Sequence, residues 1–316
     1  MVTRSPLSYS EDASKVTLIE DPMEAPKEVL EGTNPVLSSE MFSVGITDGG
    51  LVVARGVMKC TPGKYRDVVD DDEFFSIIHG RATVEIMANS VHQECVLELI
   101  EGSVGELRKG SEVIYNVHET ILKTFQLSMS ASDEDDSDIN TDIKAEQEFA
   151  TTNYSVLSST ITLQPESMEE GVSWTNGNSP PVITSALLSS MDKGRLIRGV
   201  WRCTAGSCTY VEQDELFTVL AGQATVTIKR TAVSGTDSGA GGAVVEVPEG
   251  EEVRTLVLSK GMIGEFKAGD VATFEVEGEE AFLKSFQITG MGEPATTSAS
   301  ATATANTPSS VSEMKK

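Results

Sequence analysis

Two glutamates stand where acid–base chemistry or metal binding could occur. Glu73 precedes Gly80 by seven residues, and Glu215 precedes Gly222 by the same interval. A carboxyl group inside an apolar interior can act as a general acid or base, because burial raises its pKa toward neutrality. The same group can ligate a transition metal when several imidazoles converge beside it. The sequence therefore offers one candidate acid at the same place in each half of the chain.

Histidine and cysteine, the other residues of catalytic and metal sites, are sparse. The three histidines are His79, His92 and His118, all in the first half, and we expect them in turns or on the surface. The four cysteines show no C-x-x-C spacing, which argues against a zinc knot and favours buried thiols in a reducing compartment. Cys208 has no histidine in its half of the chain to activate it as a nucleophile.

A crowded acidic run precedes and includes Glu73. Its members are Asp67, Asp70, Asp71, Asp72 and Glu73. Carboxylate oxygens suit hard cations such as calcium, so the run is compatible with an oxygen-only metal site. A solvated acidic loop would have the same sequence, and both interpretations stay open.

An internal repeat organises the whole chain. RGVMKCTPGKY begins at Arg55, and RGVWRCTAGSCTY begins at Arg198. Further matches extend to both sides, including Gly105-Glu106 with Gly264-Glu265, and Leu122 to Gln126 with Leu283 to Gln287. The turn and strand residues that define the repeat are Gly63, Gly80, Gly110, Gly206, Gly222, Gly269, Lys123 and Lys284. Each copy has the length of one domain, so the pattern predicts a duplicated domain.

Composition divides the chain into five segments. We expect a flexible N-terminal arm over 1–14, a first domain over 15–130 and a second domain over 151–292. The acidic stretch 131–150 between them predicts an extended linker, and the Ala/Thr/Ser-rich tail 293–316 predicts disorder. The second copy carries a Gly/Ser-rich insertion after Ile228, which predicts a long hairpin loop.

Short runs of β-forming residues alternate with turn residues in both copies. Examples are LVVARGVMKC and RLIRGVWRC, each followed by several more runs of about five to eight residues. The segment PMEAPKEVLEG, starting at Pro22, could form one or two helical turns, and no long amphipathic helix is predicted. The fold class is therefore all-β, with two small sandwiches or barrels.

Each copy resembles a cupin, a small double-stranded β-helix barrel, on the motifs just quoted. The Glu-to-Gly interval and Gly63 or Gly206 resemble the first cupin motif, and Gly269-Asp270 resembles the turn of the second. The nearest resemblance is to the branch that includes ureidoglycine aminohydrolase and the ethanolamine-utilisation cupins. That resemblance implies two tandem β-barrels, and in active members a divalent metal held by three histidines and the glutamate.

The histidines that the resemblance implies are missing. The H-x-H positions fall on Arg66 to Val69 in the first copy and on Cys208 to Val211 in the second. The third histidine position falls near Thr120 or Ile121, and near Glu280. We therefore predict no metal, no cofactor and no catalytic residues. If the chain were an enzyme, Glu73, Glu215 and Glu280 would be its candidate acids at the barrel mouths.

Two functions of different classes follow. The first is a non-catalytic tandem cupin with a structural or interaction role, which assembles with itself into a sheet or shell as the pyrenoid shell proteins of diatoms do; the likeness is one of architecture and acidity. The alternative is a metal-dependent cupin enzyme of the ureidoglycine aminohydrolase type, or a cupin that binds a small molecule. Of the two tryptophans, Trp201 is expected in the core rather than in a sugar platform.

Net charge narrows the partners and the location. With 49 acidic against 24 basic residues, the formal charge is -25, which disfavours nucleic acid and anionic lipid. No apolar run approaches the roughly 20 residues of a membrane span. The expected partner is another copy of the chain. The expected location is intracellular, in the plastid stroma for a shell protein and in the cytoplasm otherwise.

Overall fold

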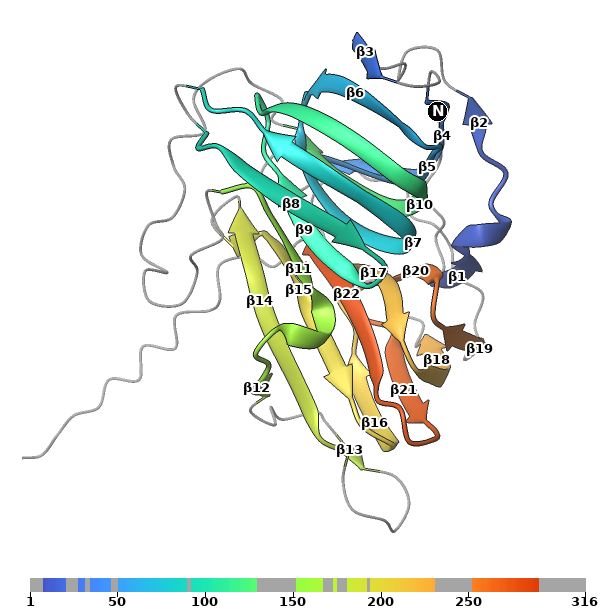
Figure 1. The fold of residues 1–316 in the computed structure, drawn as a ribbon. Helices are drawn as coiled ribbons and strands as arrows, with labels where there is room; N and C mark the ends of the chain where they lie inside the picture. Colours follow the sequence, from blue (N-terminus) through green and yellow to red (C-terminus); the bar gives the residue numbers. More distant parts are fainter. Residues whose placement is uncertain are drawn as a thin grey trace, which may run out of the picture.

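The structure is a computed structural model of the chain, and it is built almost wholly of antiparallel β-strands (Figure 1). It describes residues 8–20, 28–31, 35–46, 51–89, 92–129, 152–166, 173–174, 181–191, 194–230 and 252–289. The predicted linker, the Gly/Ser-rich insertion and the C-terminal tail lie outside these residues. Among the described residues, no helix has the length and apolar character that crossing a membrane requires.

The first domain is one ten-stranded sheet that bends into a sandwich. Its strands are β2 (Ile19–Glu20), β3 (Glu28–Glu31), β4 (Leu37–Ile46), β5 (Val52–Cys60), β6 (Gly63–Val68), β7 (Asp72–Ile86), β8 (Cys95–Ile100), β9 (Ser103–Leu107), β10 (Glu112–Met129) and the later strand β11 (Tyr154–Leu157). The long strands β7 and β10 run through both layers, and their register shifts near Gly80, which has φ +90°. Glu28–Glu31 is a strand, so helical turns are wrong for this part of the segment, whose other residues, 22–27 and 32, lie outside the described ones.

The second domain repeats this plan in two separate sheets. Its strands are β12 (Gln164–Pro165), β13 (Ser173–Trp174), β14 (Ile183–Met191), β15 (Leu196–Cys203), β16 (Gly206–Val211), β17 (Asp214–Ala221), β18 (Gln223–Arg230), β19 (Glu252–Ser259), β20 (Met262–Phe266), β21 (Val271–Val276) and β22 (Phe282–Thr289). β17 and β18 together correspond to β7, and β21 and β22 correspond to β10. The prediction of two all-β, cupin-like domains related by duplication is confirmed.

The strand that precedes each domain in the sequence pairs with the sheet of the other domain. β1 (Tyr9–Asp12) pairs with β20 of the second domain, and β11 pairs with β9 of the first. The two pairings are equivalent, because Tyr9 lies opposite Glu265 and Tyr154 lies opposite Glu106. A short 3₁₀ turn follows each arm, η1 (Ala13–Lys15) and η3 (Ser158–Thr160). The two domains are therefore joined by a reciprocal exchange of strands.

This exchange differs from the predicted boundaries in two respects. Residues 9–15 belong to β1 and η1 rather than to a flexible arm. Residues 154–157 lie in the sheet of the first domain, although the repeat assigns them to the second. Neither pairing could be foreseen, because each joins segments that are far apart in the sequence.

The interface between the domains is apolar at its two ends and polar at its centre. One end packs Phe74, Val104, Leu188 and Val200 together, and the equivalent end packs Ala13, Val57 and Ile263. At the centre, the Ser76 hydroxyl lies 2.8 Å from the Ser285 hydroxyl, and the Thr124 hydroxyl lies 3.0 Å from that of Thr218. These contacts are again related by the repeat, so the interface has approximate two-fold symmetry.

The close approach of β11 and β1 explains why both copies have a glycine at this position, Gly105 and Gly264. A Cβ at Gly105 would lie 2.2 Å from the Tyr154 carbonyl oxygen of β11 and 2.5 Å from the Phe75 ring. We expect Gly105→Ala to destabilise the protein by about 2–3 kcal/mol, because overpacking displaces the arm or the ring. Urea unfolding of the full chain measures this free energy.

Gly110→Ala is the control for that substitution. Gly110 has φ +80° but nothing within 4 Å of its Cβ position, so only backbone strain of about 1 kcal/mol is expected. If Gly105→Ala were no more destabilising than Gly110→Ala, the close approach of β11 to Gly105 would be contradicted.

Candidate functional site

The candidate site of the first domain is the interior of its barrel, where cupins hold their metal. Lys123 of β10 enters this interior and is almost fully buried. Its ammonium lies 2.5 Å from a Glu73 carboxylate oxygen and about 6 Å from the ring centres of Phe75 and Tyr115. Burial, the largest single effect, lowers the pKa of Lys123, but the charge and hydrogen bond of Glu73, together with Tyr115 and Cys60, raise that pKa overall. The motif glutamate thus already has a cation beside it.

The second barrel repeats this arrangement with a larger aromatic lining. The ammonium of Lys284 on β22 forms an ion pair with Glu215 of β17, and both residues are buried. The same ammonium lies 5.1 Å from the centre of the Phe266 ring and 5.2 Å from that of Trp201. Cation–π contacts of this kind stabilise a buried ammonium where water is excluded. Burial raises the pKa of Glu215, while Lys284 opposes that rise.

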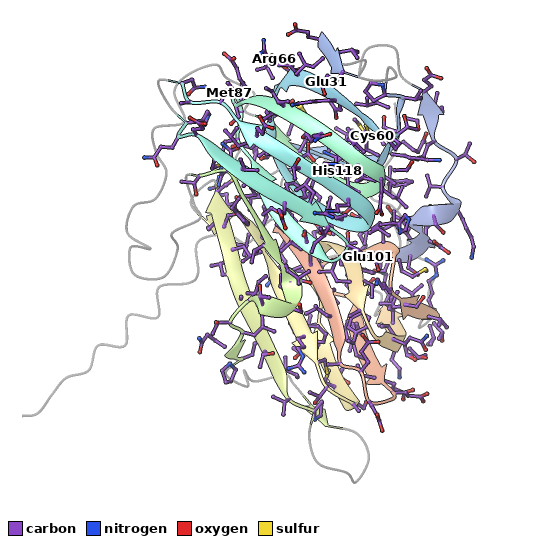
Figure 2. All side chains as sticks on the ribbon, in the orientation of Figure 1. Glu31, Cys60, Arg66, Met87, Glu101 and His118 are labelled. Atoms are coloured by element: carbon purple, nitrogen blue, oxygen red, sulfur yellow. The ribbon has the colours of Figure 1, made fainter. Side chains whose placement is uncertain are left out.

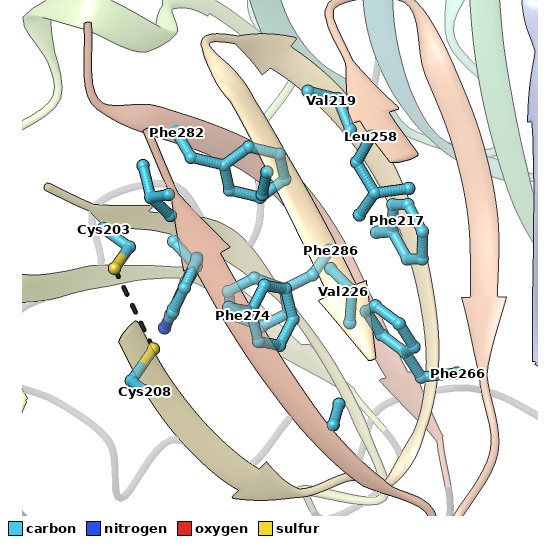
Figure 3. Close-up of a cluster of buried hydrophobic side chains, with 14 of the residues drawn as sticks. Cys203, Cys208, Phe217, Val219, Val226, Leu258, Phe266, Phe274, Phe282 and Phe286 are labelled. Atoms are coloured by element: carbon cyan, nitrogen blue, oxygen red, sulfur yellow. Dashed lines mark hydrogen bonds between the residues drawn. The ribbon is translucent and has the colours of Figure 1, made fainter. Parts of the chain in front are cut away.

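Both barrels are packed with apolar side chains around the ion pair. Figure 3 shows the second barrel, where Phe217, Phe266, Phe274, Phe282 and Phe286 lie together in the core. Trp201 belongs to the same cluster, which confirms that it is a core residue. In the first barrel, the rings of Tyr65 and Tyr115 stack with centres 4.9 Å apart. Tyr65 occupies the place that Cys208 has in the second barrel.

The donor set does not fit a cupin metal. Within the described part of the chain, no three His, Cys, Asp or Glu side chains lie together as a metal site would require. His79 and His118 are exposed, and the His92 Nε2 lies 3.1 Å from the Lys109 carbonyl oxygen. Figure 2 places His118 on the first domain. The cation beside each motif glutamate is therefore a lysine of the chain itself.

The acidic run around Glu73 is divided among separate partners. Asp72 accepts a hydrogen bond from the Lys109 backbone N–H at 2.9 Å and lies 3.5 Å from Arg108. Asp67 accepts one from the Val68 N–H, and Glu73 pairs with Lys123. These side chains do not converge, so the structure does not assemble the oxygen-only site considered from sequence. Glu280 lies exposed in the turn before β22, away from Glu215 in its barrel.

Sequence reasoning missed one acid in the second barrel. Glu212 follows β16 and is 9% exposed, and the equivalent residue of the first copy is Val69. Burial raises the pKa of Glu212 to about 8; Lys284 lowers it, whereas Glu215 and Asp270 raise it. The sequence did contain a signal for this acid: a glutamate lies just before the motif residue Glu215, at a position where the first copy has valine.

Glu212 gives the protein a pH-dependent stability. The folded state holds this proton more tightly than the unfolded chain, whose glutamate pKa is about 4.3. Stability should therefore fall as pH rises from about 4.5 to 8, by roughly 4 kcal/mol. Glu212→Val, which installs the residue of the first copy, should flatten this dependence in urea unfolding measured at several pH values. An unchanged pH profile in this variant would contradict the assignment.

A polar cluster at the domain interface is the other buried site. Arg198 of β15 is fully buried and donates to Glu106 Oε1 of the first domain at 2.6 Å. Arg108 and Ser189 also donate to Glu106, at 2.8 and 2.7 Å. Arg55, the equivalent of Arg198, donates instead to the carbonyl oxygens of Gly264 and Phe217 in the second domain. The arginine that opens each repeat therefore crosses into the other domain.

Comparisons with known proteins agree with this architecture. Residues 48–125 match the family model described as the EutQ-like cupin domain. A cupin 2 conserved barrel domain protein from Leptotrichia buccalis has a similar structure, with a TM-score of 0.51 and 11% identity over 92% of this chain and 100% of that chain. None of the curated proteins matches the chain.

Two further solved structures show weaker likenesses. A variant of oxalate decarboxylase from Bacillus subtilis has a TM-score of 0.46 and 11% identity, over 91% of this chain and 78% of that chain. The vicilin from Solanum melongena has a TM-score of 0.45 and 12% identity, over 87% and 84%. At such identities the likeness concerns the fold alone. Residues 48–125 thus carry the sequence pattern of a EutQ-like cupin domain, and the chain has the fold of two tandem cupins.

Proposed function

We propose that the chain is a non-catalytic tandem cupin that assembles with copies of itself into a protein sheet or shell. The observation that carries the proposal is the lysine–glutamate pair in each barrel, at the place where active cupins bind a metal. Because the interiors of both barrels are filled in this way, we expect the chain to act on partners through its outer surfaces. The alternative, a metal-dependent hydrolase, would need ligands that the described residues do not bring together.

The outer face of the second domain supports self-association. Four strands, β19, β18, β21 and β16, present a row of threonines in register, Thr255, Thr227, Thr273 and Thr209. On the same face, Val253 and Val257 are 53% and 68% exposed, and Val211 is 64% exposed. Within these four strands, its charged side chains are Lys229 and Glu275, whose charges cancel. On a chain of charge -25, a face that carries few charges is where two copies approach with least repulsion.

The first domain differs at the matching positions. Glu98 on β8 lies opposite Thr83 as Val257 on β19 lies opposite Thr225, so glutamate and valine are equivalent. Glu85 likewise stands where the second domain has Thr227. Only the second domain therefore presents a sparsely charged face, which we assign to contact between copies. β19 also lies at the end of its sheet, and edge strands can pair with a neighbour.

Val257→Glu tests this proposal, because it gives the second domain the residue of the first. The wild-type chain should form large assemblies in sedimentation velocity and negative-stain microscopy, increasingly so as salt screens its charge. Val257→Glu should leave the chain as small species and should raise the concentration needed for assembly at least tenfold.

Val96→Glu is the matched control. Val96 is 64% exposed on β8 of the first domain, so the change adds the same charge on another face. It should assemble as the wild type does. A wild-type chain that stays monomeric at all salt and protein concentrations would contradict the proposal. Equal effects of the two variants would overturn the assignment of the face. If the proposal holds and the assemblies are shell-like, the plastid stroma is the expected location.

A further inference from the structure

Two thiols face one another inside the second barrel. The Sγ atoms of Cys203, at the end of β15, and Cys208, in β16, lie 3.9 Å apart. Both side chains are fully buried, and Figure 3 shows them pointing toward each other. The Cys203 thiol also lies 3.3 Å from the carbonyl oxygen of Thr204, in the turn that joins the two strands.

The first copy contains the same turn without the second sulfur. Cys60 is equivalent to Cys203 and is just as fully buried, but its Sγ lies 3.9 Å from the hydroxyl of Tyr65. Cys95, the fourth cysteine, lies half-buried on β8. The chain thus holds one pair of thiols together with a buried single thiol and a more accessible single thiol.

We propose that Cys203 and Cys208 form a redox site, which is oxidised to a disulfide within the second domain. A disulfide requires its sulfurs about 2.05 Å apart, so the two side chains must rotate to bring the sulfurs about 2 Å closer than they lie here. β15 lies in the sheet with β14 and β22, whereas β16 lies in the sheet with β13 and β21. The bond would therefore tie the two sheets of this barrel to each other.

Hydrogen peroxide is small enough to serve as the oxidant in a packed interior. One thiolate attacks the peroxide O–O bond to give a sulfenic acid, and the departing hydroxide takes up the thiol proton as water. The second sulfur then displaces the sulfenic hydroxyl group, which leaves as another molecule of water. In balance, two thiols and one peroxide give one disulfide and two waters.

The surroundings make this oxidation slow in the folded protein. The hydrogen bond with Cys203, followed by burial, raises the pKa of Cys208, so little thiolate is present at neutral pH. The ammonium of Lys284 acts in the opposite direction. We expect oxidation over hours rather than seconds, and a bond that is equally slow to be reduced.

Mass spectrometry of the full wild-type chain tests the site. The folded chain is treated with hydrogen peroxide, a second sample is refolded with oxidised glutathione, and both are alkylated and mapped without reduction. We expect a peptide linking Cys203 to Cys208 that has lost two hydrogen atoms, and Cys60 recovered as a free thiol. The oxidised form should melt about 5 °C higher than the reduced form.

Cys208→Ser is the matched variant, and it should give no cross-linked peptide and no shift in melting temperature. Cys60 serves as an internal control, because it is equally buried and has no second sulfur beside it. Recovery of Cys203 and Cys208 as free thiols in both samples, while Cys95 is oxidised, would overturn the proposal. So would conversion of either residue to the sulfinic acid without a cross-link.

Discussion

Replacing Lys284 with methionine should destabilise the protein by about 3–5 kcal/mol at neutral pH. Methionine keeps the length of the side chain but leaves the Glu215 carboxylate buried without its cation. The loss should shrink as the pH falls toward 5, because Glu215 can then fold as the neutral acid. Urea unfolding at two pH values measures both effects.

A double variant separates the ion pair from simple packing. Lys284→Met combined with Glu215→Leu removes both charges, and its stability should lie within about 1 kcal/mol of the wild type. Lys229→Met, on the exposed face of β18, should change stability by less than about 0.5 kcal/mol. A double variant as unstable as Lys284→Met would show that the pair is not the reason for the loss.

Arg198→Ala should cost a similar amount, about 3–5 kcal/mol, for a related reason. Arg198 is fully buried and shares Glu106 with Arg108 and Ser189, so its removal leaves a buried carboxylate with fewer donors. It also empties space at the domain interface beside the Phe74 ring, whose centre lies 5.6 Å from the guanidinium carbon. Thermal or urea unfolding of the full chain gives the free energy.

Arg202→Ala provides the control on the same strand. Arg202 is exposed on β15, four residues from Arg198, and its removal should change stability by less than about 0.5 kcal/mol. Equal effects of the two substitutions would contradict the role assigned to the interface cluster. Because Glu106 belongs to the first domain, we also expect both domains to unfold together in the wild type.

The strands could be predicted from the sequence because their signal is local. Runs of β-forming residues bounded by turn residues predicted strands at 51–60 and 195–203, and the structure places β5 and β15 there. The glycines Gly80 and Gly222 mark real irregularities, with φ of +90° and +72°: Gly80 lies at a register shift inside β7, and Gly222 separates β17 from β18. The strand exchange was not predictable, because a four-residue arm such as Tyr9–Asp12 acquires its partner over 250 residues away.

The site was predictable only in outline. The repeat singled out Lys123 and Lys284, and Glu73 and Glu215, but not that they pair, since each pair joins distant strands. One signal was available: a lysine that recurs at the same place in the closing strand of both copies, within a largely apolar run, is expected to need a buried anion. The arginine that opens each repeat gave a similar signal, and for Arg198 the buried anion is Glu106.

Metal content shows whether the two lysine–glutamate pairs keep a metal out of the barrels. The full chain, incubated with Mn²⁺, Fe²⁺ or Zn²⁺ and then desalted, is analysed by elemental mass spectrometry beside Glu73→Gln and Glu215→Gln variants. Because a lysine ammonium already neutralises each motif glutamate, we predict less than about a tenth of an equivalent of any of these metals per chain. Retention of one equivalent or more, lost on substitution of either glutamate, would contradict this account of the two barrels.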